Sequence, residues 1–379
     1  MEDRRLGWVA LGLLFAVHPR YKSHIRLQSV SPGDLFGAAP GALETALSLR
    51  PQEAQDIFSR NFPDWAEKEI KAAGKEGVAI LTFDDAGYPP GLRNLPDPPP
   101  ILYVKGQIEP DDSAAVAVVG SRKATPYGLR VAGDLGKGLA AEGLAVVSGL
   151  ARGIDTAAHR GAIDAGGRTV GVLGSGIDVV YPKENRLLFE QVSSAGAVVT
   201  EFPFGTAPHA FHFPVRNRII AALSGAVVVV EAARGSGSLI TAKLAADEMG
   251  LPVCAVPGAI TSTNSQGCND LIYDGATPVR DVRDILEQLP VTFRQRASEI
   301  KQARAADPQR ARVSGLAPRD LGRDARAVLR HLAPDEPKSV DELASSLKLA
   351  TAALLGHLLE LEIKGLASQL PGGLYVRKS

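Results

Sequence analysis

Short, unbroken apolar runs recur along the middle of the chain, separated by turns rich in glycine or proline. The runs lie at 78–83, 101–104, 115–119, 144–148, 169–173, 197–200, 226–230 and 252–256. Apolar, β-branched runs without alternation are typical of strands that are buried on both faces. Helix-compatible stretches follow several of them, at about 126–141, 154–165 and 184–194. This order predicts an α/β fold, a doubly wound, Rossmann-like and mostly parallel sheet with helices on both faces.

The N-terminal flank has a different pattern from this middle part, which we expect to span residues 74–290. Residues 1–73 hold apolar runs that proline and glycine interrupt, which predicts a small, separate helical domain. The first run, at 7–17, follows Arg4 and Arg5 as in a signal peptide, but no small-residue cleavage site comes after it. It is also shorter than the roughly 20 apolar residues of a membrane span. We therefore expect a buried helix and no membrane span.

The C-terminal flank changes composition twice. Residues 291–320 hold many arginines and few apolar residues, which predicts a basic, partly helical linker. Residues 321–379 predict three helices and a hairpin, the arrangement of a winged-helix domain. The third helix, at 351–364, carries Glu360 and Glu362 against His357 and Lys364. Because carboxylates repel phosphate, we expect this domain to contact protein more than to read bases.

Charge and cysteine content narrow the classes of function. The 379 residues hold 42 Lys+Arg and 42 Asp+Glu, so the formal net charge is zero. A nucleic-acid binder with this balance needs a local basic patch. Cys254 and Cys268 form neither a disulfide framework nor a metal spacing, which favours a reducing cytoplasm.

Small residues, often with a nearby cation, follow the predicted strands. These segments are GSRK at 120–123, SGLARG at 148–153, GSG at 174–176, YPKEN at 181–185, GT at 205–206 and GSGS at 235–238. Ligands of open α/β sheets bind at the carboxyl ends of the strands. Small residues allow close approach and cations favour phosphate. The last turn also opens a helix whose free N–H groups favour an anion, although alone it is equally typical of an ordinary strand-to-helix corner.

Known catalytic and cofactor motifs are missing from the sequence. It has no Walker A motif, no complete G-x-G-x-x-G fingerprint and no G-x-S-x-G elbow. His209 and His212 have the spacing of a helical metal pair, but prolines flank them and no third ligand is evident, so we expect no metal and no cofactor. Asp155 and His159, four residues apart on a predicted helix, could share a hydrogen bond. Each is also explained by a structural role.

A phosphate pocket without catalytic groups remains, and its polymeric ligand would be single-stranded nucleic acid. Four aromatic residues lie near the predicted loops and could stack on bases. Each of them is also an acceptable core residue. They are Tyr127, Tyr181, Phe211 and Phe213.

Five ordered motifs resemble those of the DNA-processing protein A family, DprA/Smf. They are VAVVGSRKATPYG at 116–128, VVSGLARGIDTAAHRGA at 146–162, VLGSGIDVVYPKENRLL at 172–188, HFPVRNRIIAALS at 212–224 and GSGSLITA at 235–242. The resemblance covers residues 77–290 densely. It implies a non-enzymatic protein that binds single-stranded DNA in natural transformation, protects incoming strands, promotes annealing and loads the recombinase RecA. It also implies a homodimer through an extended Rossmann domain, a sterile-alpha-motif-like start and a winged-helix end.

The resemblance implies a basic DNA pocket made by Arg122, Lys183, Arg216 and Arg218. We expect Arg216 to point into the strand-end crevice. Arg218 lies about 200° away around a helix, so both can meet one strand only if the helix begins between them. The full set of DNA-binding candidates is Gly120, Ser121, Arg122, Lys123, Gly149, Lys183, Arg216, Asn217, Arg218, Gly235, Ser236, Gly237 and Ser238.

An enzymatic alternative stays open at this point. The strand-end pattern is also similar to nucleotide phosphoribohydrolases of the lysine-decarboxylase-like group. Those carry P-G-G-x-G-T and then a catalytic glutamate, whereas this chain reads ARGSGSLITA at 233–242. Glu231 or Asp155 would have to supply the acid.

Overall fold

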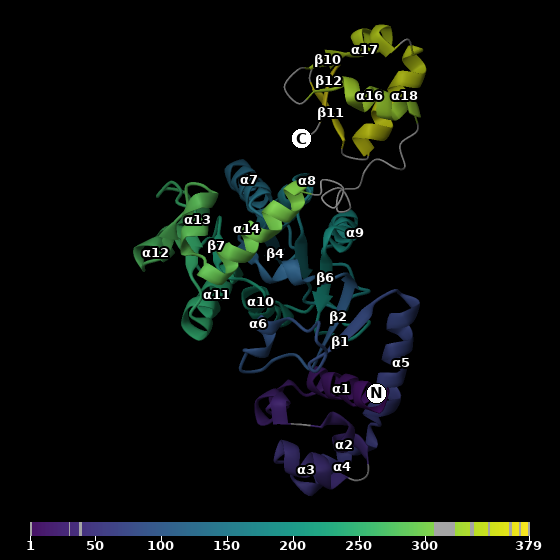
Figure 1. The fold of residues 1–379 in the computed structure, drawn as a ribbon, viewed down its shortest axis with the longest axis vertical. Coiled ribbons are helices and arrows are strands. Elements are labelled where there is room, and N and C mark those ends of the chain that lie inside the picture. The colour runs from purple at the N-terminus through teal and green to yellow at the C-terminus, as the bar shows by residue number, and fades with distance from the viewer. Residues whose placement is uncertain are drawn as a thin grey trace. The chain divides into compact units, whose positions relative to one another are not determined.

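The computed structural model describes residues 2–29, 31–37, 40–306, 323–333, 337–347, 349–363, 366–370 and 373–377. The chain forms two compact units, Met1–Gly315 and Leu316–Ser379 (Figure 1). Each is described by itself below.

A nine-stranded sheet organises the first unit, in the order β1-β2-β6-β5-β4-β3-β7-β8-β9. The pairs β1–β2 and β2–β6 are antiparallel. The seven strands that follow β2 in this order, β6 through β9, are all mutually parallel. The predicted doubly wound, mostly parallel sheet is thus confirmed. The strands are β1 Ala79–Thr82, β2 Ile101–Gly106, β3 Ala115–Val119, β4 Ala145–Ser148, β5 Thr169–Val172, β6 Ala197–Thr200, β7 Val227–Val229, β8 Val253–Ala255 and β9 Thr277–Pro278.

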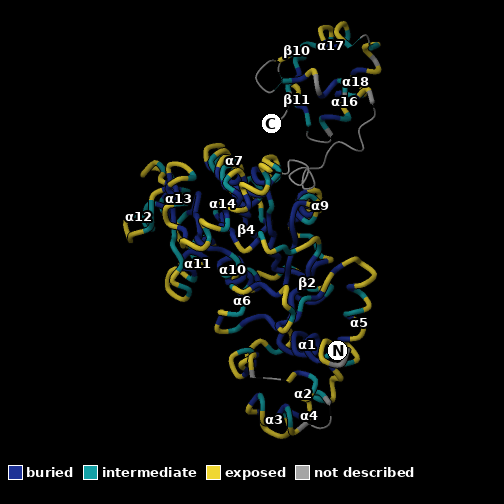
Figure 2. The backbone as a smooth tube through the Cα atoms, viewed as in Figure 1, coloured by how far each residue is buried: buried dark blue, intermediate teal, exposed yellow. Residues whose placement is uncertain are grey.

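Helices cover both faces of this sheet and bury two separate hydrophobic clusters. Figure 2 shows the strands as the most deeply buried part of the unit. Thr125 accepts a hydrogen bond from the Gly128 amide and begins α7 at the predicted residue. The helices are α6 Pro90–Arg93, α7 Pro126–Ala141, α8 Ile154–Asp164, α9 Arg186–Ala195, α10 His212–Ala222, α11 Gly237–Lys243, α12 Gln266–Tyr273 and α13 Val282–Gln288.

The N-terminal residues are helical, as predicted, but they are not separate from the sheet. They form α1 Glu2–Val17, α2 Pro32–Gly37, α3 Pro40–Leu47, α4 Pro51–Ser59 and α5 Phe62–Lys75. Helix α1 is the expected buried helix, with Trp8 and Leu11 fully enclosed. Its apolar side chains join the same hydrophobic cluster as β2, and Gly12 lies directly on Ile101. This shared core corrects the expectation of a separate domain. Among the described residues, no helix is long and apolar enough to cross a membrane.

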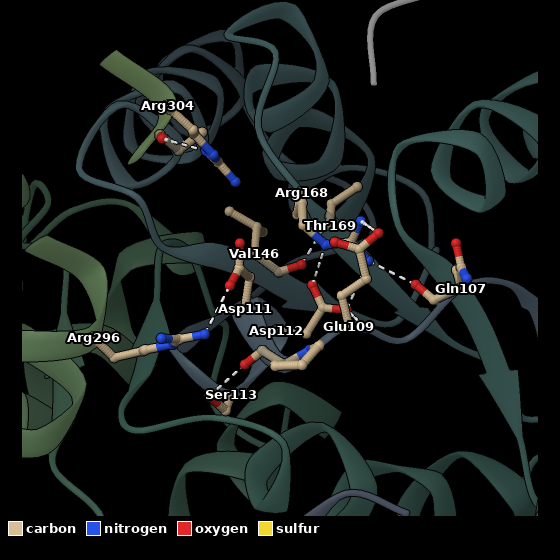
Figure 3. A network of polar contacts seen from close by, with 12 residues as sticks. Gln107, Glu109, Asp111, Asp112, Ser113, Val146, Arg168, Thr169, Arg296 and Arg304 are labelled. Carbon is tan, nitrogen blue, oxygen red and sulfur yellow. Dashed lines mark hydrogen bonds and ion pairs between the residues drawn. The ribbon is translucent and has the colours of Figure 1, made fainter. Parts of the chain in front are cut away.

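Helix α14, Val291–Ala306, corrects the prediction of a linker beginning at residue 291. Ala297 and Ile300 are buried against the unit. Arg296 donates to Asp111 at 3.0 Å, beside the ion pair between Arg168 and Asp112 (Figure 3). Few apolar residues are enough to dock the helix, because ion pairs flank them. The remaining predicted linker cations, Arg310, Arg312 and Arg319, lie outside the described residues.

The second unit has the predicted three helices and hairpin. Its elements are α16 Arg323–His331, β10 Lys338–Ser339, α17 Val340–Leu347, α18 Thr351–Ile363, β11 Ala367–Leu370 and β12 Leu374–Arg377, with strand order β10-β12-β11. A capping box begins α17, since Glu342 N donates to Ser339 Oγ at 3.2 Å and Ser339 N donates to the Glu342 carboxylate at 2.8 Å. Lys364, at the end of the predicted third helix, lies outside the described residues.

Candidate nucleic-acid interface

A hollow opens at the carboxyl ends of β3, β4 and β5, next to the point between β3 and β7 where the strand order reverses. It is therefore near the place where open α/β sheets bind their ligands. Its lining is Arg122, Gly149, Ala151, Arg152, Leu173, Gly174, Ser175, Tyr181, Pro182, Phe213 and Arg216. We call it the strand-end pocket.

Arg216 forms the floor of the strand-end pocket, as predicted. Its side chain is buried, and its guanidinium donates to the carbonyl oxygens of Gly149, at 2.7 Å, and Val172. A side chain at position 149 would overlap the guanidinium, so only glycine fits there. Burial lowers the pKa of Arg216 to about 10, and nearby Asp155 opposes that shift. A buried cation with free space beside it favours an anion.

Aromatic rings and a second arginine form one wall of the same pocket. Arg122 lies over the ring of Phe213, with 4.6 Å from the guanidinium carbon to the ring centroid. Tyr181 lies against the same ring at 5.8 Å and is 40% exposed. Two of the four aromatic residues predicted to stack on bases, Tyr181 and Phe213, thus line the same hollow as Arg122 and Arg216.

Arg152 lines the strand-end pocket, yet it was absent from the predicted candidates. Its guanidinium donates to the carboxylate of Glu184, which belongs to the YPKEN segment. Both side chains are more than half exposed. The arginine inside the SGLARG strand end was the available signal. The structure adds that this cation already has a carboxylate partner.

Arg218 faces away from the strand-end pocket, so the geometry expected for it is corrected. Helix α10 begins at His212, before both arginines, and therefore presents them on different sides. Arg218 is buried and donates two hydrogen bonds to Glu201, at 2.6 and 2.7 Å. Burial alone would raise the pKa of Glu201, but Arg218 and Lys22 hold it below its usual value. Arg218 is thus neutralised by a neighbour and has no free side toward the pocket.

The other predicted DNA-binding residues do not line the pocket; the lysines are exposed, and the small residues after β3 pack inside the strand end. Lys183 and Lys123 are exposed and do not line the pocket, although Lys183 directly follows Pro182, which does. Gly120 packs on Ile154 and on the backbone of Glu231. Ser121 donates its amide to the Glu231 carbonyl at 2.7 Å. Gly120 and Ser121 therefore shape the strand end.

The Gly235–Ser238 turn, whose four residues are among the predicted DNA-binding candidates, does not line the pocket. Ser236 Oγ accepts the Ser238 amide at 3.4 Å and begins α11. Asn217 connects this turn to Arg216, because its amide nitrogen donates to the Gly237 carbonyl at 3.3 Å and its side-chain oxygen accepts from Arg216 at 3.2 Å. The turn supports Arg216 through Asn217.

The acids that a hydrolase would need are engaged by the backbone. Asp155 accepts the amides of Gly149, at 3.0 Å, and Ala151, at 3.3 Å, and burial raises its pKa. Glu231 accepts the amide of Thr125 at 2.9 Å and its hydroxyl at 2.5 Å. Both carboxylates thus hold loops in place.

His159 is a buried structural histidine, which is one of the two roles considered for it. His159 is fully buried, and its Nδ1 lies 2.7 Å from Thr169 Oγ1, so its partner is not Asp155. Burial lowers the pKa of His159 to about 3. The rings of His209 and His212 lie 5.4 Å apart. Within the described residues, no group of three or more histidine, cysteine or acidic side chains could hold a metal ion.

Fold and site together define an open α/β protein with a cationic, aromatic-lined pocket at its strand ends. Residues 79–290 match the family described as DNA recombination-mediator protein A, and residues 305–373 match the DprA winged helix domain. The chain belongs to this DNA recombination-mediator protein A family, whose members are named DprA or Smf.

Individual relatives agree with this assignment. Protein Smf of Synechocystis sp. is 36% identical over 320 residues, covering 79% of this chain and 80% of that protein. DNA processing protein DprA of Streptococcus pneumoniae is 44% identical over 232 residues, covering 61% of this chain and 81% of that protein. The crystal structure of DprA from Streptococcus pneumoniae superposes with a TM-score of 0.62 at 34% identity, covering 76% of this chain and 96% of that one.

A second solved relative carries information on a ligand. DNA processing protein A from Helicobacter pylori, described with a unique single-stranded DNA binding mode, has a TM-score of 0.51 at 28% identity. The match covers 56% of this chain and 97% of that one.

Proposed function

We propose that this chain binds single-stranded DNA at the strand-end pocket and acts by binding rather than by catalysis. The observation that carries the proposal is the joint presence of Arg122, Arg216, Phe213 and Tyr181 in one hollow. The guanidinium groups match phosphate oxygens, and the rings match unstacked bases. A duplex keeps its bases stacked inside, so only a single strand can use both kinds of contact.

The sheet makes this site rigid before a strand arrives. Arg216 is fixed to two strand-end carbonyls, and Asp155 fixes the loop after β4 through two amides. Preorganised donors lose little entropy on binding. Family membership supports the proposal, as does the single-stranded DNA binding mode described for the Helicobacter pylori relative.

The wider role follows from the family and extends the binding proposal. On this view the protein works in natural transformation in the cytoplasm, protects incoming strands, promotes annealing and loads RecA, and forms a homodimer through the Rossmann-like domain. The hydrolase alternative finds less support, because Glu231 and Asp155 are both held by backbone amides.

A salt titration with matched single-stranded and double-stranded oligonucleotides tests the binding proposal. Single-stranded affinity should fall with salt with a log-log slope of about −0.7 for each phosphate contact. Arg122→Ala should weaken binding and make the slope shallower by about 0.7. Arg216→Ala should weaken binding as well, provided that thermal melting shows a folded protein.

Arg130, an exposed arginine on α7 that does not line the pocket, gives a matched control as Arg130→Ala. Its replacement should leave the affinity nearly unchanged. Equal affinity for both strand types, or equal effects of Arg122→Ala and Arg130→Ala, would refute the assignment of the pocket.

A further inference from the structure

A second hollow lies on the other side of the first turn of α10. Helix α1 and the following turn supply one wall, with Phe15, Pro19 and Lys22. The loop after β6 and α10 supply the other wall, with Phe202, Phe211 and Val215. We call it the α1–α10 hollow. None of the predicted DNA-binding candidates lines it, although Phe211 is one of the four predicted stacking residues.

Four rings form a continuous cluster at its edge. The rings of Phe202 and His212 lie 4.3 Å apart, and those of Phe211 and His212 lie 4.4 Å apart. His209 and Phe211 are stacked, with centroids 5.5 Å apart and an interplanar angle of 3°. Phe211 is nevertheless 66% exposed. A ring held in place by neighbours, with most of its surface in water, is a prepared stacking surface.

The charges of the α1–α10 hollow favour an uncharged ligand group over phosphate. Glu201 lines it, and Lys22 and Arg218 both pair with that carboxylate, at 2.7 and 2.6 Å. Arg218 also pairs with Asp97 at 3.4 Å, so two carboxylates balance the two cations, and the remaining lining is mostly apolar. A nucleobase fits such a surface, because it offers an aromatic face without charge.

The two hollows share one turn of helix. Phe213 and Arg216 line the strand-end pocket, whereas Phe211, His212 and Val215 line the α1–α10 hollow. The helix is about 10–12 Å across with its side chains, and a nucleotide spans about 3.4 Å, so a strand that leaves the first hollow meets the second within a few nucleotides. Resting on the proposed function, we propose that the α1–α10 hollow, with Phe211 as its platform, stacks a base of the same strand beyond the strand-end pocket.

Binding of oligothymidylates of increasing length, from a dinucleotide upward, tests this second base site. Phe211→Ala should leave the affinity for the shortest oligonucleotides unchanged and lower it once the strand reaches the second hollow. Loss of one stacked base lowers affinity by about five- to hundredfold. Phe211→Trp should keep the affinity for long strands. Arg122→Ala, in contrast, should weaken binding at every length.

Trp65 provides a matched control, since its ring is 38% exposed, stacks on Phe62 and lines neither hollow. Trp65→Ala should bind long strands as the wild type does. If Arg122→Ala weakens binding at all lengths but Phe211→Ala has no length-dependent effect, the second base site is refuted while the proposed function stands. If neither variant changes binding, the proposed function fails too.

Discussion

Glu184 should act as an internal competitor for the strand that enters the strand-end pocket. Its carboxylate holds Arg152, one of the pocket's own cations. A phosphate that contacts Arg152 must displace this carboxylate or bind beside it. Glu184→Gln removes the charge, keeps the size of the side chain and should therefore raise the affinity for single-stranded DNA.

The size of this gain follows from the geometry of the ion pair. Because the carboxylate contacts the guanidinium directly, a phosphate on the same group would lie roughly 5 Å from it. A like charge at that distance in water changes a binding constant about fourfold. The freed Arg152 adds one phosphate contact, so the log-log salt slope should steepen by about 0.7. Folding stability should change little, because the pair is exposed.

Fluorescence anisotropy across a salt series measures both effects. Glu190→Gln replaces an exposed glutamate on α9, the helix that follows the turn of Glu184; it makes the same change in net charge and should give a much smaller gain. Arg152→Ala should cost more affinity in the Glu184→Gln background than in the wild type. Equal gains for the two glutamine variants, or additive effects of Arg152→Ala and Glu184→Gln, would refute the competition.

Three further predictions concern stability. Arg218→Ala leaves Glu201 buried with Lys22 alone and should lower the free energy of unfolding in urea by about 3 kcal/mol. The folded variant should keep its affinity for single-stranded DNA. A large loss of affinity in the folded variant would contradict the placing of Arg218 outside the pocket. Gly136→Ala should destabilise the protein, because its Cβ would overlap the Ala158 carbonyl. In Gly133→Ala the atom nearest to the new Cβ lies at 3.9 Å, so this substitution should be neutral or stabilising by up to about 1 kcal/mol. Thermal melting of the two variants measures the difference. Burial lowers the pKa of His159 to about 3 in the folded protein, so the unfolded chain binds a proton first as pH falls below about 6.5, and this histidine should then lower the free energy of unfolding by about 1.4 kcal/mol per pH unit. His159→Gln should therefore make the stability in urea less dependent on pH between about 6 and 4. An unchanged pH profile would contradict the assignment.

The sequence predicted the fold well wherever local signals agree with burial. Unbroken apolar runs marked all strands from β3 to β8, and the helix-compatible stretches marked the starts of α7 and α8. Helix α14 was taken for a linker because only Ala297 and Ile300 anchor it deeply. The two-residue strand β9 has too short a run to stand out.

The site was predictable for residues whose position depends on the strand ends, and less so for those whose role depends on a partner. Arg122 lies in the pocket because it follows the end of β3, and Arg216 because it lies near the start of α10. Arg218 was misplaced because Glu201, which binds it, comes from another element 17 residues away. Arg152 had a local signal in the SGLARG strand end, but its pairing with Glu184, 32 residues away, had none. Long-range charge pairing has no local pattern in the sequence.

The fastening of Arg216 to two strand ends divides the pocket into a fixed and an adjustable part. Its guanidinium joins the carbonyl groups of Gly149 and Val172, so any replacement loosens the sheet along with the ligand contact. Arg122 and Arg152 at the opening contribute little to the core and can vary without that cost. Substitutions that change the affinity during evolution should therefore occur at Arg122 and Arg152, while Arg216 is kept.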